Sequence, residues 1–307
     1  MNRQFTGTDN LPKGEASDNI TAGCLVLEGG AFRSLYSQGV LDALMENDLN
    51  FQTVIGVSAG GMCGAGYVAG QIGWCARINL EFRHDSNYIG LGAMRHDHGI
   101  TGFSYLYDEL MKDFPFNLER FNDPRRRFLV CATDVVTGRP AYFERGKCRD
   151  IFKAIQASAT VPYVSRPVEI GGRLYLDGGA TGSTNIPYDW AVRQEFKRII
   201  VVKTRDRAYR ADVTKITTAP VNRFLYHQYP EFEKGLELNP MNYNSLLERI
   251  EADAMAGRNF TIAPSVPLEV GRFEPDVDRL AQIYYRGYND MYGEIDRLRE
   301  YLEKNPQ

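Results

Sequence analysis

Apolar residues with two different spacings alternate along the first quarter of the chain. Residues 24–27 form a short apolar run that is typical of a buried strand, and apolar residues then recur at helical spacing between positions 32 and 44. A second apolar run at Phe51–Val57 precedes a segment of small residues at 59–70. Strand, helix, strand and helix in this order predict an α/β fold with a mostly parallel sheet.

The same alternation continues downstream. It predicts strands at 128–133 and 199–203 and a helix at 151–157. Residues 168–177 predict a β-hairpin, because Gly171-Gly172 lies between two short alternating runs. The hairpin would place Asp177 at its far end.

After about residue 206 the pattern changes to aromatic-rich connections, followed by amphipathic helices at 245–256 and 275–302. We expect three parts. Residues 1–21 are predicted to be a flexible leader, 22–205 an α/β domain, and 206–307 a helical layer packed on that domain. The last helix could alternatively form a coiled coil with a partner.

Composition adds few constraints. A chain of 307 residues with 43% apolar content can bury a large core. The net charge of −3 gives no electrostatic reason to expect nucleic acid as a partner. The uncharged stretch 54–74 is long enough to span a membrane, but its glycine content disfavours a helix exposed to lipid. A helix that packs closely on the sheet is the favoured interpretation.

Cysteine usage and the N-terminal composition indicate a compartment. The five cysteines are scattered without paired spacing, and the first residues lack the apolar run of a secretory signal. We therefore expect reduced thiols and a cytoplasmic location.

Two glycine-framed turns and one aspartate carry the candidate chemistry. Residues 28–33, Glu-Gly-Gly-Ala-Phe-Arg, follow the first strand, and their N–H groups favour an anion at the start of the next helix. Residues 56–60, Gly-Val-Ser-Ala-Gly, fit G-x-S-x-G, in which a strand breaks sharply into a helix and exposes the serine hydroxyl. A serine needs a base, and the carboxylate of Asp177, followed by Gly178-Gly179, is suited to accept its proton.

These three motifs, in this order, resemble the bacterial patatin-like phospholipases. The family pattern has a glycine-rich D/E-G-G-G-x-R-G turn, then G-x-S-x-G, then D-G-G or D-G-A. This chain departs from the first motif at Ala31 and Ser34. If position 31 requires a positive φ, alanine there costs about 1 kcal/mol.

The resemblance implies a patatin-like three-layer fold in which residues 22–205 form the catalytic domain of a serine acyl hydrolase. It implies a catalytic Ser58–Asp177 dyad that cleaves esters of lipids or phospholipids through an acyl-enzyme, without cofactor or metal, and a transient contact with a membrane surface. The expected oxyanion donors are Gly29, Gly30, Ala31 and Ala59. The expected supporting residues are Arg33, Gly56, Gly60, Gly178 and Gly179.

Other readings stay open at the level of sequence. An ordinary α/β-hydrolase would use a Ser58–Asp177–His227 triad, and a non-catalytic module would bind acyl groups or anions without turnover. His96-Asp97-His98 suggests a metal site, but no further ligand is spaced to complete one. The run Arg125-Arg126-Arg127 is typical of a solvated edge, with docking on anionic lipid as the alternative.

Overall fold

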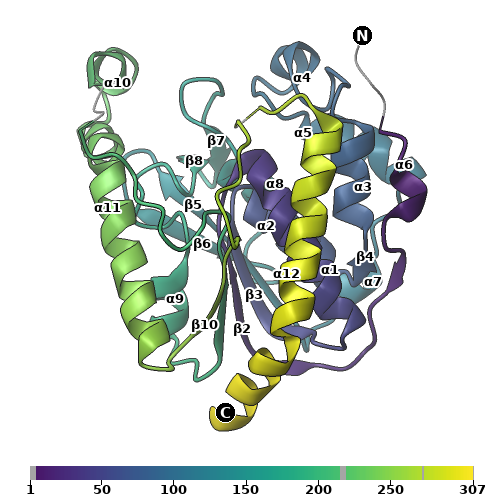
Figure 1. Cartoon of the computed structure of the whole chain (residues 1–307). Coiled ribbons are helices and arrows are strands. Elements are labelled where there is room, and N and C mark those ends of the chain that lie inside the picture. The colour runs from purple at the N-terminus through teal and green to yellow at the C-terminus, as the bar shows by residue number, and fades with distance from the viewer. Residues whose placement is uncertain (1–4, 215–218, 272, 307) are drawn as a thin grey trace.

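The computed structural model describes residues 5–214, 219–271 and 273–306, and it has three layers with a mostly parallel sheet in the middle, as predicted (Figure 1). Within these residues the strands of the main sheet follow the order β10-β9-β2-β3-β5-β8-β7, and β6 pairs with β5. Pairs β5–β6, β5–β8 and β7–β8 are antiparallel, and the other pairs are parallel. The strands are Thr21–Leu27 (β2), Phe51–Val57 (β3), Arg127–Asp134 (β5), Pro140–Glu144 (β6), Val168–Ile170 (β7), Arg173–Asp177 (β8), Ile199–Val202 (β9) and Phe260–Ile262 (β10).

Helices cover both faces of the sheet (Figure 1). The longer ones among the described residues are Leu35–Glu46 (α1), Ala59–Val68 (α2), Trp74–Glu81 (α3), Ile151–Ser158 (α8), Ala219–Tyr226 (α10), Pro230–Met255 (α11) and Val277–Lys304 (α12). Shorter turns of helix are Thr8–Asn10 (η1), Ala31–Ser34 (η2), Leu91–His96 (α4), Phe103–Tyr105 (α5), the π-helical Leu106–Leu110 (η3), Met111–Asp113 (α6), Leu118–Phe121 (α7) and Tyr188–Arg193 (α9).

The central strands β2, β3, β5 and β9 are buried and mostly apolar on both sides, which divides the core in two. Alternate residues of β2, such as Leu25 and Leu27, pack with α1, α2, α8 and α12 on one face. Their neighbours Cys24 and Val26 pack with α9 and α11 on the other. This is why the strands appear in the sequence as continuous apolar runs.

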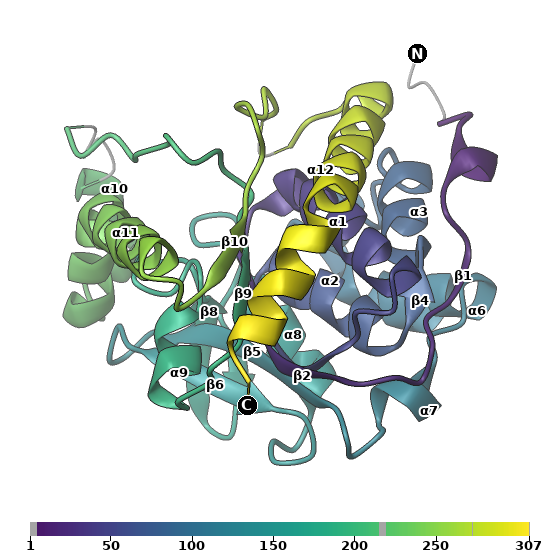
Figure 2. The same ribbon diagram turned by 60° about the horizontal axis from the view of Figure 1, so that its bottom comes forward.

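The C-terminal region is more than the predicted helical layer. Its strand β10 extends the parallel sheet beside β9, with Phe260 opposite Ile200. Its two long helices lie on opposite faces of the sheet, α11 beside α9 and α12 beside α1 (Figures 1 and 2). Residues 206–307 therefore complete the α/β fold rather than cover it from outside.

A close crossing fixes α12 to α1. A Cβ at Gly39 would collide with the carbonyl oxygen of Tyr284, and a Cβ at Gly287 would collide with that of Tyr36. The two tyrosines then bond across the interface, because Tyr284 donates its hydroxyl to Asp42 at 2.7 Å and Tyr36 donates to Asp290 at 3.1 Å. With this apolar face covered within the chain, the alternative of a coiled-coil partner for α12 has no support here.

The predicted flexible leader, residues 1–21, needs correction over the part that the structure describes. Gly14–Glu15 (β1) pairs with Gln71–Ile72 (β4), and Leu11 is 3% exposed. The physical reason is that Leu11 and Ala16 join the main core, a burial that the polar composition around them conceals. Residues 1–4 lie outside the described part.

Two further sequence alternatives can be compared with the structure. Among the described residues, no helix has both the length and the apolar character needed to cross a membrane. The arginine run is engaged within the protein: Arg125 pairs with Asp123 at 2.7 Å, Arg127 pairs with Glu144 at 2.9 Å, and Arg126 is buried. The run stands at the start of β5, at the opposite end of the strand from the candidate site, so docking on lipid there is not supported.

Candidate active site

Ser58 occupies a strained turn between β3 and α2. Its backbone has φ +55° and ψ −132°, a conformation that non-glycine residues rarely adopt and that positions a serine side chain outward from the turn. The turn closes only because two neighbours lack side chains. A Cβ at Gly56 would lie 2.6 Å from the carbonyl oxygen of Gly60, and one at Gly60 would lie 2.5 Å from that of Glu28.

Ser158, at the end of α8, holds this turn in place. Its hydroxyl accepts a hydrogen bond from the Ser58 N–H at 2.9 Å and donates one to the carbonyl oxygen of Cys131 at 2.6 Å. The residue is completely buried. It was not predicted, because a single serine at a helix end has no motif that distinguishes it.

The register of the sheet brings Ser58 and Asp177 together. Val57, the last residue of β3, pairs with Cys131 of β5, and Asp177, the last residue of β8, pairs with the next residue, Ala132. Since β6 occupies the other side of β5 at Ala132, β3 and β8 lie on the same side and run toward each other. The two strands therefore meet end to end, and a Cβ at Gly178 would lie 3.2 Å from Val57 Cγ1.

The turn after β8 presents the Asp177 carboxylate. Its Oδ1 accepts the N–H of Gly179 at 2.8 Å, and the Asp177 carbonyl oxygen accepts the Thr133 hydroxyl at 2.9 Å. From α11, Asn239 Nδ2 donates to the carbonyl oxygens of Gly179 and Ala180 at 2.9 and 2.8 Å. The C-terminal region thus supports the aspartate turn, which the sequence did not indicate.

The first glycine turn lies beside the serine. A Cβ at Gly29 would lie 3.1 Å from Ser58 Cβ, a tight contact that favours glycine there. The N–H of Gly29 donates to the carbonyl oxygen of Asn185 at 3.0 Å, so it is not available to an oxyanion in this conformation. Gly30 and Ala31 stand at the N-terminus of η2, and Ala59 is the first residue of α2, where helices leave N–H groups without internal acceptors.

A buried carboxylate anchors that turn. Glu28 is 1% exposed, and its Oε1 accepts Asn185 Nδ2 at 3.1 Å. Tyr243 of α11 donates its hydroxyl to the same oxygen, and the N–H of Thr204 after β9 donates to Oε2. Glu28 therefore ties the turn to three distant segments. The sequence placed Glu28 in the motif but gave no sign of these partners.

Ala31, which departs from the family pattern, has a positive φ of +47°, so the condition considered for this position is met. We expect Ala31→Gly to raise the free energy of unfolding by about 1 kcal/mol. Glycine removes the strain of the left-handed backbone, and the larger conformational entropy that glycine loses on folding offsets only part of this gain. Thermal denaturation should show a Tm increase of about 2 °C. Ala256→Gly, at a helix end with φ −82°, is the matched control and should give no increase. Equal behaviour of the two variants would contradict the strain at Ala31.

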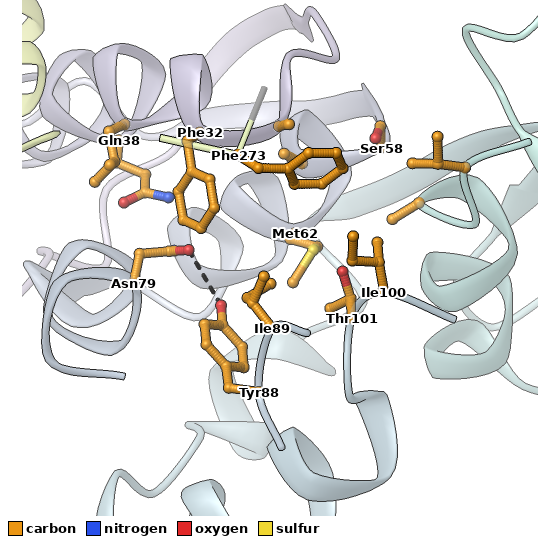
Figure 3. Close-up of a pocket in the computed structure, with 15 residues that line it drawn as sticks. Phe32, Gln38, Ser58, Met62, Asn79, Tyr88, Ile89, Ile100, Thr101 and Phe273 are labelled. Atoms are coloured by element: carbon orange, nitrogen blue, oxygen red, sulfur yellow. Dashed lines mark hydrogen bonds between the residues drawn. The ribbon is translucent and has the colours of Figure 1, made fainter. Parts of the chain in front are cut away.

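Ser58 stands at the boundary between two cavities of different character. A cavity of about 480 Å³ holds Ser58, Asp177 and Arg33 together with the backbone of the glycine turn. A smaller apolar cavity of about 80 Å³ leads from Ser58 past Met62, Ile89 and Phe273 (Figure 3). The arrangement suits a molecule with a polar part and an apolar part joined at the serine.

The histidines lie elsewhere. None of the described residues that line the two cavities around Ser58 is a histidine. His227 is exposed after α10, and its Nδ1 lies 3.3 Å from the carbonyl oxygen of Phe224. His84 is half-buried, and desolvation lowers its pKa. Among the described residues, the lining of the cavities around Ser58 therefore offers no histidine as a base.

The Patatin family, described as patatin-like phospholipase, matches residues 25–191, more than half of the chain. A family described as a domain of unknown function, DUF6363, matches residues 229–303. An uncharacterized protein of Escherichia coli, YjjU, is 27% identical over 59% of this chain and 51% of its own length. The probable lipid hydrolase 463L of invertebrate iridescent virus 6 is 24% identical over 74% of this chain and 83% of its own length.

Among solved structures, VipD from Legionella pneumophila aligns with 99% of this chain and 70% of its own, with a TM-score of 0.47 and 12% identity. The match to YjjU spans about half of that relative's length, and so do those to the mycobacterial proteins named NTE family. The family match covers the glycine turn, the serine turn and the aspartate turn in one stretch. The chain belongs to the patatin-like phospholipase family.

Proposed function

We propose that this protein is a serine acyl hydrolase that cleaves carboxylic esters of lipids or phospholipids. Ser58 Oγ attacks the ester carbonyl carbon while the Asp177 carboxylate accepts its proton. The N–H groups of Gly30, Ala31 and Ala59 stabilise the oxyanion. When the ester C–O bond breaks, Asp177 returns the proton to the leaving alcohol. Water then attacks the acyl-enzyme with Asp177 again as base, and the acid is released as Ser58 is reprotonated.

The observation that carries this proposal is the meeting of β3 and β8 on one side of β5. It supports a direct Ser58–Asp177 pair. Ser58 directly follows the last residue of β3, which pairs with Cys131, and Asp177 is the last residue of β8 and pairs with the adjacent Ala132. Both side chains line the same cavity. Gly29 enters the proposal through its small size, which admits Ser58, rather than as a donor.

Lipid as the substrate class is supported by the cavities and by one relative. The apolar cavity suits an acyl chain and the larger cavity, with Arg33, suits the remainder of an ester. The viral relative is named a probable lipid hydrolase. Leu91 of α4, 75% exposed and two residues after the cavity residue Ile89, supports a transient contact with a membrane surface. A cytoplasmic location stays a proposal, supported by the five free cysteines.

The test is an esterase assay on the purified wild-type chain with p-nitrophenyl butyrate. Turnover is expected, and an initial burst of about one equivalent of p-nitrophenol will accompany it where hydrolysis of the acyl-enzyme is slower than its formation. Phosphatidylglycerol vesicles with detection of free fatty acid then examine lipid as substrate. If neither substrate is hydrolysed and a fluorophosphonate probe fails to label the protein, the non-catalytic alternative replaces this proposal.

A further inference from the structure

The apolar cavity beside Ser58 continues into the interior. A second cavity of about 40 Å³ lies between α1, α2, α3, η3 and α8, with Cys75 and Phe152 in its lining. Both cavities are lined by the same four residues, Gln38, Met62, Asn79 and Tyr88. In Figure 3, Ser58 lies at one end of the row of side chains, Met62 in the middle, and Gln38 with Asn79 and Tyr88 at the other end. A chain entering from Ser58 reaches this polar group beyond Met62.

Gln38 has unused hydrogen-bonding capacity there. Its side chain is buried, with the residue 6% exposed, and its Oε1 has no hydrogen-bond partner among the described residues. Its Nε2 has only a weak acceptor, Cys63 Sγ at 3.4 Å. A buried amide oxygen without a partner costs free energy, so such a group in a cavity wall indicates a ligand or an ordered water.

The neighbours of Gln38 do not supply the missing donor. Tyr88 donates its hydroxyl to Asn79 Oδ1 at 3.1 Å, and Asn79 donates its Nδ2 to the carbonyl oxygen of Cys75 at 2.9 Å. The Tyr88 oxygen keeps its capacity to accept. The polar end of the cavity therefore presents the Gln38 and Tyr88 oxygens as acceptors, beside the remaining N–H groups of the Gln38 and Asn79 amides.

We infer that the preferred acyl group carries a hydroxyl along its chain, which donates a hydrogen bond to Gln38. This inference rests on the proposed function and names its substrate class. A hydroxyl fits better than other polar groups, because it also accepts if the Gln38 amide turns to present Nε2. A charged group would be buried without a counter-charge among the lining residues of either cavity.

The test compares p-nitrophenyl octanoate with octanoate esters that carry one hydroxyl at carbon 3, 6 or 8. Wild type is expected to prefer at least one hydroxylated ester about tenfold in kcat/KM, the size of one satisfied hydrogen bond. In Gln38→Met, which keeps the volume and removes the amide, this ratio should fall to about one or below. Met62→Leu, an apolar change at the same junction, is the matched control and should keep the ratio.

The outcomes separate the two proposals. Hydrolysis of all esters without preference for any hydroxylated one would overturn the inference and assign the unpaired Gln38 oxygen to a bound water, with the proposed function intact. A preference that survives in Gln38→Met would also overturn it. No hydrolysis of any ester would contradict the proposed function itself. The wild-type comparison alone decides if Gln38→Met does not fold, as judged by circular dichroism.

Discussion

Ser58→Ala is expected to lower kcat for ester hydrolysis by about 10⁴- to 10⁶-fold, the range found when an enzyme loses its nucleophile. The change removes one oxygen from a half-buried side chain. Alanine, like serine, has a Cβ, so the positive-φ backbone is no more strained than before and the fold should be retained. Steady-state kinetics with p-nitrophenyl butyrate measures the loss. A fluorophosphonate probe should label the wild type at the peptide containing Ser58 and leave the variant unlabelled.

Ser37→Ala is the matched control for this experiment. Ser37 is completely buried on α1, its hydroxyl has no partner among the described residues, and it does not line either cavity around Ser58. The control should keep both turnover and labelling. Undiminished turnover in folded Ser58→Ala, or labelling of another residue, would contradict the assignment of the nucleophile.

Residues 22–205 were largely predictable because local pattern and tertiary structure agree there. The apolar run at Phe51–Val57 is the whole of β3, and the glycine pair Gly171-Gly172 does form the hairpin turn, with both φ values positive. The 128–133 prediction lies within β5, Arg127–Asp134. These segments are buried on both faces or held by short-range turns, so their sequence carries the signal.

The C-terminal region was predicted less completely for physical reasons. Helix α11 begins at Pro230, well before the predicted start at 245. The first half was predicted as a connection because Pro240, which lies inside the helix, is a residue that usually interrupts helices. Strand β10 has only three residues and no alternation long enough to detect. The placement of α12 beside α1 depends on the Gly39–Gly287 crossing, which no local pattern reveals.

The residues of the candidate site also fall into two groups, those that a local motif marks and those that it does not. Ser58 and Asp177 could be predicted as candidates because each lies in a motif that is typical of a sharp turn. Ser158, Asn185 and Tyr243 could not, since each acts from a distant segment on a backbone group or on Glu28. Sequence motifs mark where the chain bends, whereas the residues that hold the bends come from distant helices and loops and depend on the tertiary packing.

The choice between a dyad and a triad depends on which base reaches Ser58. Asp177 ends β8 beside the end of β3, and its turn is braced by Gly179 and by Asn239 from α11. His227 is exposed and lies next to the carbonyl oxygen of Phe224. A general base must come within hydrogen-bond reach of the proton it accepts, and Asp177 is the candidate base that lines the same cavity as Ser58.

Asp177→Asn is therefore expected to lower kcat by at least about 10³-fold, because an amide cannot accept the serine proton at neutral pH. The fold should survive, since the Asn oxygen can still accept the Gly179 N–H that Asp177 accepts at 2.8 Å. Asp134→Asn is the matched control. Asp134 ends β5, accepts the N–H groups of Val136 and Thr137 at 3.0 and 2.9 Å, and pairs with Arg173 at 2.7 Å. It lines neither cavity around Ser58, so the folded variant should keep the wild-type kcat. The four single histidine variants His84→Ala, His96→Ala, His98→Ala and His227→Ala should each retain most activity. Kinetics on these variants, with circular dichroism to establish folding, decides the matter, and a thousandfold loss in folded His227→Ala would replace the dyad with the triad.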